Sequence, residues 1–129
     1  MSLLDTDDLT GTVNEIARVL RPGGHLRVAL VHPMASPQDP ETMHTREPKV
    51  SRPYLEERRY EDRMERDGLS MTVASMHRPL GTYIAACAQA GLLMEGMREF
   101  GAKPIPWLLT ARFTRSPGSA GRRTTTCPT

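Results

Sequence analysis

The sequence predicts an α/β fold in which a helix, a central strand, a hairpin, a second helix and an antiparallel pair of strands follow one another. Three observations predict it. Apolar residues recur at helical spacing between Leu9 and Leu20. An apolar run at 28–31 follows a Pro-Gly-Gly turn. The dipeptide Asp67-Gly68 separates two candidate strands, which is typical of a tight hairpin.

Length and charge predict one small domain with a separate tail. The chain has 129 residues, enough for one hydrophobic core. Its net charge of +2 belongs to residues 114–129, because removing Arg115, Arg122 and Arg123 leaves 14 basic against 15 acidic residues. We therefore expect a domain at 1–113, a disordered basic tail at 114–129 and no nucleic-acid partner.

Cysteine usage and hydropathy predict a cytoplasmic protein. Cys87 and Cys127 have neither the number of a disulfide framework nor the spacing of a metal site, so we expect free thiols and no metal. The first five residues lack the basic and apolar regions of a signal peptide. No apolar run approaches the roughly 20 residues of a membrane span, so no membrane partner is expected.

The first helix is expected at 7–20, with Asp5 as its N-cap. Its buried face follows from spacings of four, three and four residues: Leu9, Val13, Ile16 and Leu20. Pro22 cannot continue the helix, and Gly23 or Gly24 can take the left-handed conformation that ends it.

The strand after this turn, His25–Val31, is apolar at every position from 28 to 31. This pattern predicts a strand buried on both faces, as in a parallel sheet. The following connection, Pro33–Pro53, contains five prolines and is too rich in proline for regular structure. Loops of this length in small domains are often functional or disordered.

The charged segment 54–67 fits either a helix or a strand. As a helix it offers only Tyr60 and Met64 as an apolar pair, whereas as a strand it places Tyr54 on the same face as these two. The Asp67-Gly68 turn favours the strand. After it, apolar and small polar residues alternate at 69–74, which predicts a half-buried strand. We expect a hairpin that lies over one edge of the domain.

The last elements are a helix and two strands. Pro79 opens the helix and Gly91 ends it. Its buried stripe is predicted at Leu80, Tyr83, Ile84 and Cys87. The strands Leu92–Phe100 and Trp107–Phe113 are joined by a connector short enough to make them antiparallel. One face of the second strand would carry Trp107, Leu109, Ala111 and Phe113.

The sequence resembles the C-terminal half of class I S-adenosylmethionine-dependent methyltransferases, and within them the small-molecule type 11 group that includes ubiquinone and menaquinone biosynthesis enzymes. Three stretches carry the resemblance and together span most of 1–113. They are residues 1–8, the helix–turn–strand segment Arg18–Pro33 with its Arg-Val-Leu-Arg-Pro-Gly-Gly turn, and His77-Arg78-Pro79-Leu80 with the residues that follow. The resemblance implies a partial Rossmann-like methyltransferase sheet and S-adenosylmethionine as cofactor.

One motif of that family is missing from this chain. The family binds its cofactor at a glycine-rich turn that follows a strand and opens a helix, where backbone N–H groups approach the ligand closely. Gly23-Gly24 stands in the reverse order, after a helix and before a strand. The first half of the fold is therefore expected to be absent, which leaves an open edge where a fourth strand would pair.

The resemblance also suggests site residues. His32 ends the central strand, where α/β sheets place ligands, and is the candidate catalytic base. Ser2 and Leu3 match family positions near the cofactor. Met34, His77 and Arg78 are the candidate substrate contacts. Structural alternatives stand beside these roles: the His32 ring can simply bond a backbone group, and Arg78 can pair with an acid of the 56–67 segment.

Two hypotheses of function follow. The first is a methyltransferase-like protein that acts on a small molecule and is truncated or inactive alone. The second is a non-catalytic interaction module, or a truncated gene product, that forms a homodimer or recruits a complementing chain through the open sheet edge.

Overall fold

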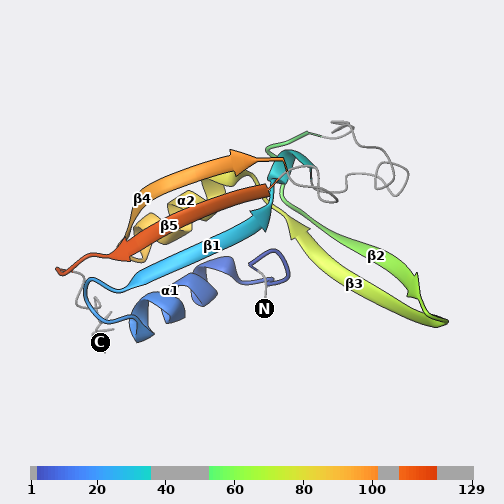
Figure 1. The fold of residues 1–129 in the computed structure, drawn as a ribbon, viewed down its shortest axis with the longest axis horizontal. Helices are drawn as coiled ribbons and strands as arrows, with labels where there is room; N and C mark the ends of the chain where they lie inside the picture. The colour runs from blue at the N-terminus through green and yellow to red at the C-terminus, as the bar shows by residue number, and fades with distance from the viewer. Residues whose placement is uncertain (1–2, 36–52, 102–107, 119–129) are drawn as a thin grey trace, which may run out of the picture.

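A computed structural model describes residues 3–35, 53–101 and 108–118. The described residues form two α-helices, a three-stranded sheet and a two-stranded hairpin, and the hairpin projects from the rest of the molecule (Figure 1). The elements in chain order are α1 (Leu9–Val19), β1 (His25–Val31), the short 3-10 helix η1 (Pro33–Ala35), β2 (Arg58–Arg66), β3 (Leu69–His77), α2 (Leu80–Gln89), β4 (Leu92–Phe100) and β5 (Leu108–Arg115).

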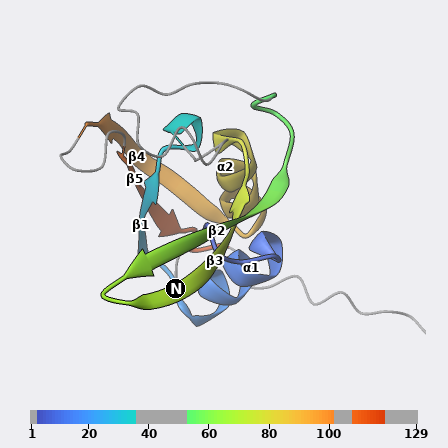
Figure 2. The ribbon, with the colours of Figure 1, turned by 90° about the vertical axis from the view of Figure 1, so that its right-hand side faces the viewer.

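The main sheet has the strand order β1-β5-β4, and both pairings are antiparallel. The last strand therefore lies between the first strand and the fourth. Both helices lie on one side of this sheet, as Figure 2 shows, and they contact each other. Among the described residues β1 pairs only with β5, so its other edge is open.

The core lies between the two helices and the facing side of the sheet. α1, α2 and β5 supply most of it, and β1 and β4 add one residue each. The buried residues are Leu9, Val13, Ala17, Leu30, Tyr83, Ala86, Cys87, Leu92, Leu109, Ala111 and Phe113. The predicted stripe of α2 is buried at Tyr83 and Cys87 and partly buried at Leu80 and Ile84. The predicted face of β5 is confirmed at its described positions, while Trp107 lies outside the described residues.

The prediction for the first helix is right in position and wrong at its cap. Asp8, not Asp5, is the N-cap, and its carboxylate accepts a hydrogen bond from the N–H of Gly11 at 2.8 Å. Asp5 instead accepts a hydrogen bond from the Ser75 hydroxyl at 2.9 Å. At the other end Gly23 has a φ of +73°, the left-handed conformation that the turn requires.

The prediction that β1 is buried on both faces is wrong. Exposed and partly buried residues alternate along it, and only Leu30 is fully buried. The helices cover one side of the sheet and no described element covers the other. β1 is therefore an antiparallel strand with one apolar face, the ordinary condition of such sheets.

The hairpin forms as predicted but projects from the domain instead of lying over its edge (Figures 1 and 2). Asp67 and Gly68 have φ values of +54° and +78°, as a tight two-residue hairpin turn requires. Leu69 and Met71 are 75% and 57% exposed, so the expected half-buried strand is buried only toward its end at His77.

Backbone and side-chain contacts fasten the base of the hairpin to residues 4–7. The N–H of Met76 donates to the carbonyl of Leu4 at 2.8 Å, and Arg59 pairs with the Asp7 carboxylate at 3.1 Å. The N-terminal segment thus lies beside β3.

The final strand includes the first two residues of the expected tail. β5 includes Thr114 and Arg115, and the Arg115 N–H donates to the carbonyl of Gly24 at 2.9 Å. The domain therefore extends past Phe113. The rest of the expected tail, from 119 onward, lies outside the described residues.

Candidate functional site

Most of the predicted site residues belong to elements that begin or end where the hairpin joins the rest of the molecule (Figure 1). β1 ends there at Val31, η1 follows, and α2 begins there directly after β3. Two separate clusters form. One surrounds Arg78 and His77 at the hairpin base, and the other surrounds His32 beyond the end of β1.

Arg78 is buried at the junction of three segments, with 3% exposure. Its Nη2 donates to the backbone carbonyls of Thr6 and Asp7 at 2.7 and 2.9 Å. Its Nε lies 3.8 Å from the Glu57 carboxylate. These contacts match the alternative in which Arg78 pairs with an acid of the 56–67 segment. Through these contacts the guanidinium connects the N-terminal segment, the hairpin base and the start of α2.

His77 is buried beside it, with 1% exposure. Its Nε2 lies 2.9 Å from the Tyr54 carbonyl, which makes this nitrogen the donor. The Tyr54 ring stands edge-on to the imidazole, and its hydroxyl accepts a hydrogen bond from the N–H of Leu80 at 2.8 Å. In this structure His77 holds residue 54 against the start of α2, so its expected contact with substrate stays a prediction.

His32 has both ring nitrogens engaged. Nδ1 accepts a hydrogen bond from the N–H of Met34 at 3.1 Å, so Nε2 carries the proton and donates to the Glu99 carboxylate at 2.8 Å. The contact is possible because Val31 and Phe100 both lie opposite Leu108, so β1 and β4 end level with each other. The backbone bond agrees with the structural alternative. Catalysis by His32 stays a prediction.

A shallow groove of about 410 Å³ lies beside the hairpin base. Its lining includes Asp7, Glu57, Arg78 and Thr82. Glu57 accepts a hydrogen bond from the Thr82 hydroxyl at 3.0 Å, so this acid touches both α2 and Arg78. Sequence reasoning anticipated an acid of the 56–67 segment beside Arg78 without singling out Glu57. It did not find Tyr54 or Glu99, because each acts through a partner more than twenty residues away.

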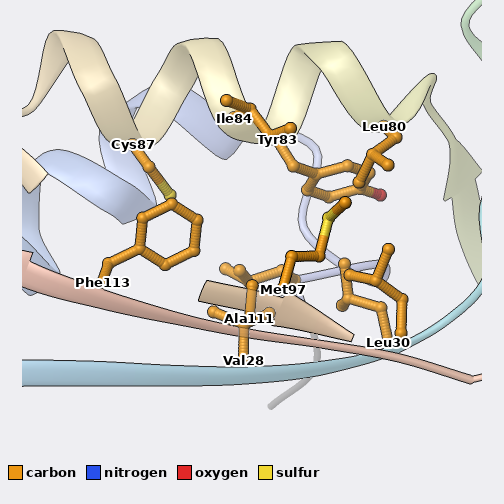
Figure 3. A pocket seen from close by; sticks show the side chains of 11 residues that line it. Val28, Leu30, Leu80, Tyr83, Ile84, Cys87, Met97, Ala111 and Phe113 are labelled. Atoms are coloured by element: carbon orange, nitrogen blue, oxygen red, sulfur yellow. The ribbon is translucent and has the colours of Figure 1, made fainter. Parts of the chain in front are cut away.

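The remaining predicted site residues are Leu3 and Ser2. Ser2 lies outside the described residues. Leu3 lines a small apolar cavity with Tyr83, Cys87 and Met97, part of which Figure 3 shows. The cavity measures about 20 Å³, room for about one water molecule. Ligand pockets are typically larger than about 300 Å³, so this cavity is a packing gap.

Burial raises the pKa of two side chains that line this cavity, the Cys87 thiol and the Tyr83 hydroxyl. Desolvation raises the pKa of Cys87 to about 11. Burial also raises the pKa of Tyr83, and the nearby Arg78 opposes that rise. Both groups are therefore neutral at physiological pH, and the Cys87 thiol lacks the low pKa of a reactive cysteine.

The described residues do not fit S-adenosylmethionine by themselves. Gly23 and Gly91 both have positive φ, but each follows a helix and precedes a strand. A phosphate- or nucleotide-type glycine turn needs the opposite order. No group of three or more His, Cys, Asp or Glu side chains in the described ranges is placed to hold a metal. Nor does the described part contain a helix long and apolar enough to cross a membrane.

Two solved structures share this fold. A protein assigned as an S-adenosylmethionine-dependent methyltransferase from Listeria monocytogenes matches with a TM-score of 0.66 and 19% identity, over 90% of this chain and 58% of its own. An S-adenosylmethionine-dependent methyltransferase from Mesorhizobium loti matches with a TM-score of 0.55 and 17% identity, over 89% and 59%. No protein-family model and no curated protein matches the sequence.

The chain has a partial class I methyltransferase fold. This confirms the fold class expected from the sequence. The chain spans less than two thirds of the length of either methyltransferase. The type 11 subgroup stays a prediction.

Proposed function

We propose that this chain is part of an S-adenosylmethionine-dependent methyltransferase that acts on a small molecule in the cytoplasm. One observation carries the proposal. The fold of this chain matches two such methyltransferases over about nine tenths of its length, while more than a third of each of their lengths has no counterpart here.

In this proposal the chain supplies the substrate side of the site, and most cofactor contacts come from polypeptide beyond the described residues. Met34 is 38% exposed, next to a histidine that Glu99 holds in place. An apolar side chain beside an oriented polar pair is suited to a small organic substrate. Ser2 and Leu3 would contribute at the margin of the cofactor. In this proposal the chain is therefore a truncated methyltransferase that is inactive by itself.

A chimera tests the proposal. The part of the Listeria protein that has no counterpart here would be fused to this chain, and S-adenosylhomocysteine binding would be measured by calorimetry. We expect the chimera to bind S-adenosylhomocysteine at least about tenfold more tightly than either part alone, because binding requires preorganised contacts from both parts. A chimera that is folded by circular dichroism and cooperative melting but does not bind would contradict the proposal.

The open edge of β1 supports a second candidate, an interaction module that forms a homodimer or recruits a complementing chain. An unpaired edge strand presents free N–H and C=O groups to another chain. Light scattering over a hundredfold range of protein concentration measures the self-association. A rise from monomer to dimer mass would favour this candidate, whereas a constant monomer mass would exclude the homodimer.

A further inference from the structure

We propose that the sheet surface opposite the helices binds an acidic polypeptide segment. This surface, the arginine face, is defined by Arg27 on β1, Arg112 on β5 and Arg98 on β4, with Gly96 among them. The inference is independent of methyl transfer. Neither the resemblance nor the site at the hairpin base assigns any role to this surface.

The strand register places these residues on one side of the sheet. Ala111 and Phe113 face the core, so Arg112 between them faces away from it. Arg27 and Gly96 both lie opposite Arg112, one on each neighbouring strand. Arg98 is two residues from Gly96 and therefore points the same way. Three cationic side chains, one from each strand, thus share this side of the sheet with a position that has no side chain.

Charge on this face is poorly balanced within the described chain. Arg112 forms an ion pair with Glu95, whose carboxylate also accepts a hydrogen bond from Thr114. Arg27 and Arg98 have no carboxylate within 4 Å among the described residues. Like charges directly opposite each other destabilise a sheet. If this face were only solvated, the pairing of Arg27 with Arg112 would not stabilise the sheet. An anionic partner would be attracted by both side chains.

The surface is also hollowed at this point. An open depression of about 620 Å³ is lined by Arg27, Arg98, Arg112, Thr110, Ala29 and Gly96. A Cβ atom placed on Gly96 would meet no atom within 4 Å. Gly96 stands at a shift in the β4–β5 register, and glycine in a strand marks either such an irregularity or a place where a ligand or another backbone approaches closely.

Three observations favour a polypeptide as the occupant. The depression is too open to enclose most of a small molecule, as ligand pockets do. The acidic balance of residues 1–113 disfavours nucleic acid, because nucleic-acid surfaces carry their basic excess within the folded domain. About two fifths of the chain of each similar methyltransferase lies outside the matched part, and no described element of this chain covers this sheet face.

Titration of the full chain with poly-L-glutamate at low salt, followed by calorimetry, tests the inference. We expect binding, and about tenfold weaker binding in Arg27→Glu and in Gly96→Phe. The first variant reverses a charge, and the second adds a bulky side chain at a position where a Cβ meets no atom within 4 Å. Arg27→Glu should also raise the thermal midpoint, because a Glu–Arg pair replaces an Arg–Arg pair.

The matched control is Arg66→Glu, which makes the same charge reversal at an 89% exposed side chain near the hairpin tip. It should leave the affinity for poly-L-glutamate unchanged. Three results would overturn the inference: no binding by the parent chain, an equal loss in Arg66→Glu, or tighter binding of duplex DNA than of poly-L-glutamate. The last would assign the face to nucleic acid.

Discussion

Arg78 illustrates how one buried charge can organise several segments. Its guanidinium bonds two carbonyls of the N-terminal segment and faces Glu57 near the hairpin base. Removing such a group leaves the carbonyls and the carboxylate without their partner, in a place that water reaches poorly.

We predict that Arg78→Met lowers the free energy of unfolding by about 2–4 kcal/mol. Urea denaturation monitored by circular dichroism measures it. Arg18→Met is the control, because the Arg18 side chain is 69% exposed and its one ion pair with a described residue is with Glu15 on the same helix. That change should cost no more than about 0.5 kcal/mol. Equal losses in the two variants would contradict the bracing role of Arg78.

Because Cys87 is buried, the fold should lose stability at alkaline pH. Its folded pKa of about 11 is above the ordinary value of 9.0. The folded state therefore holds the thiol proton more tightly, so this contribution is complete below pH 9 and is lost as the pH rises to about 11. Tyr83, whose pKa is also raised by burial, adds to the loss above pH 10.

We predict a fall in unfolding free energy of up to about 3 kcal/mol from Cys87 between pH 9 and pH 11. Denaturation curves across this range measure it. Cys87→Ala should be less stable at pH 8 but should lose less over the same interval. A variant with the same pH slope as the parent chain would disprove the assignment.

At the scale of residues, the sequence predicts what depends on neighbours along the chain. Gly23 ends the first helix region because a positive φ is required there, and that follows from the local pattern. The choice of Asp8 over Asp5 as N-cap depends on tertiary structure, because Ser75 of β3 engages Asp5. The contacts of His32 with Glu99 cannot be found from sequence, since 67 positions separate them.

At the scale of elements, the hairpin is the most independent part of the molecule. Its two strands pair with each other in a separate two-stranded sheet, and only its base contacts the domain. Cooperative stability should therefore decrease from His77 toward the turn at 67–68.

We predict that Gly68→Ala loosens the hairpin without unfolding the domain. At a φ of +78° alanine costs about 1 kcal/mol, and no neighbouring atom adds to that cost. Hydrogen exchange should lose protection in β2 and β3 near the turn, while the main thermal midpoint stays within about 1–2 °C. Gly96→Ala is the control, because a Cβ there also meets open space. Gly96→Ala should leave the hydrogen-exchange protection of the hairpin unchanged. A lower main thermal midpoint in Gly68→Ala would contradict the independence of the hairpin.

The elements were predictable where a local signal exists. Turn chemistry at Asp67-Gly68 identifies the hairpin, and helical periodicity identifies α1 and α2. The direction of the hairpin and the single buried face of β1 depend on which elements pack nearby. An apolar run of four residues does not show which of its sides has a partner layer.

At the scale of the whole molecule, the order β1-β5-β4 places the last strand between two earlier ones. Antiparallel pairing of β4 with β5 follows from their short connector. Insertion of β5 beside β1 does not follow from any local pattern, and the sequence does not predict it. Within the described residues, one face of this sheet has no covering layer and the outer edge of β1 has no paired strand.

Calorimetric titration of the folded chain with S-adenosylhomocysteine tests this account most directly. The described residues offer an apolar gap of about 20 Å³ and glycines placed at helix ends. We therefore predict no binding heat at ligand concentrations up to about 1 mM, where a complete site would bind far more tightly. Micromolar binding by the chain alone would contradict the claim that most cofactor contacts come from polypeptide beyond the described residues.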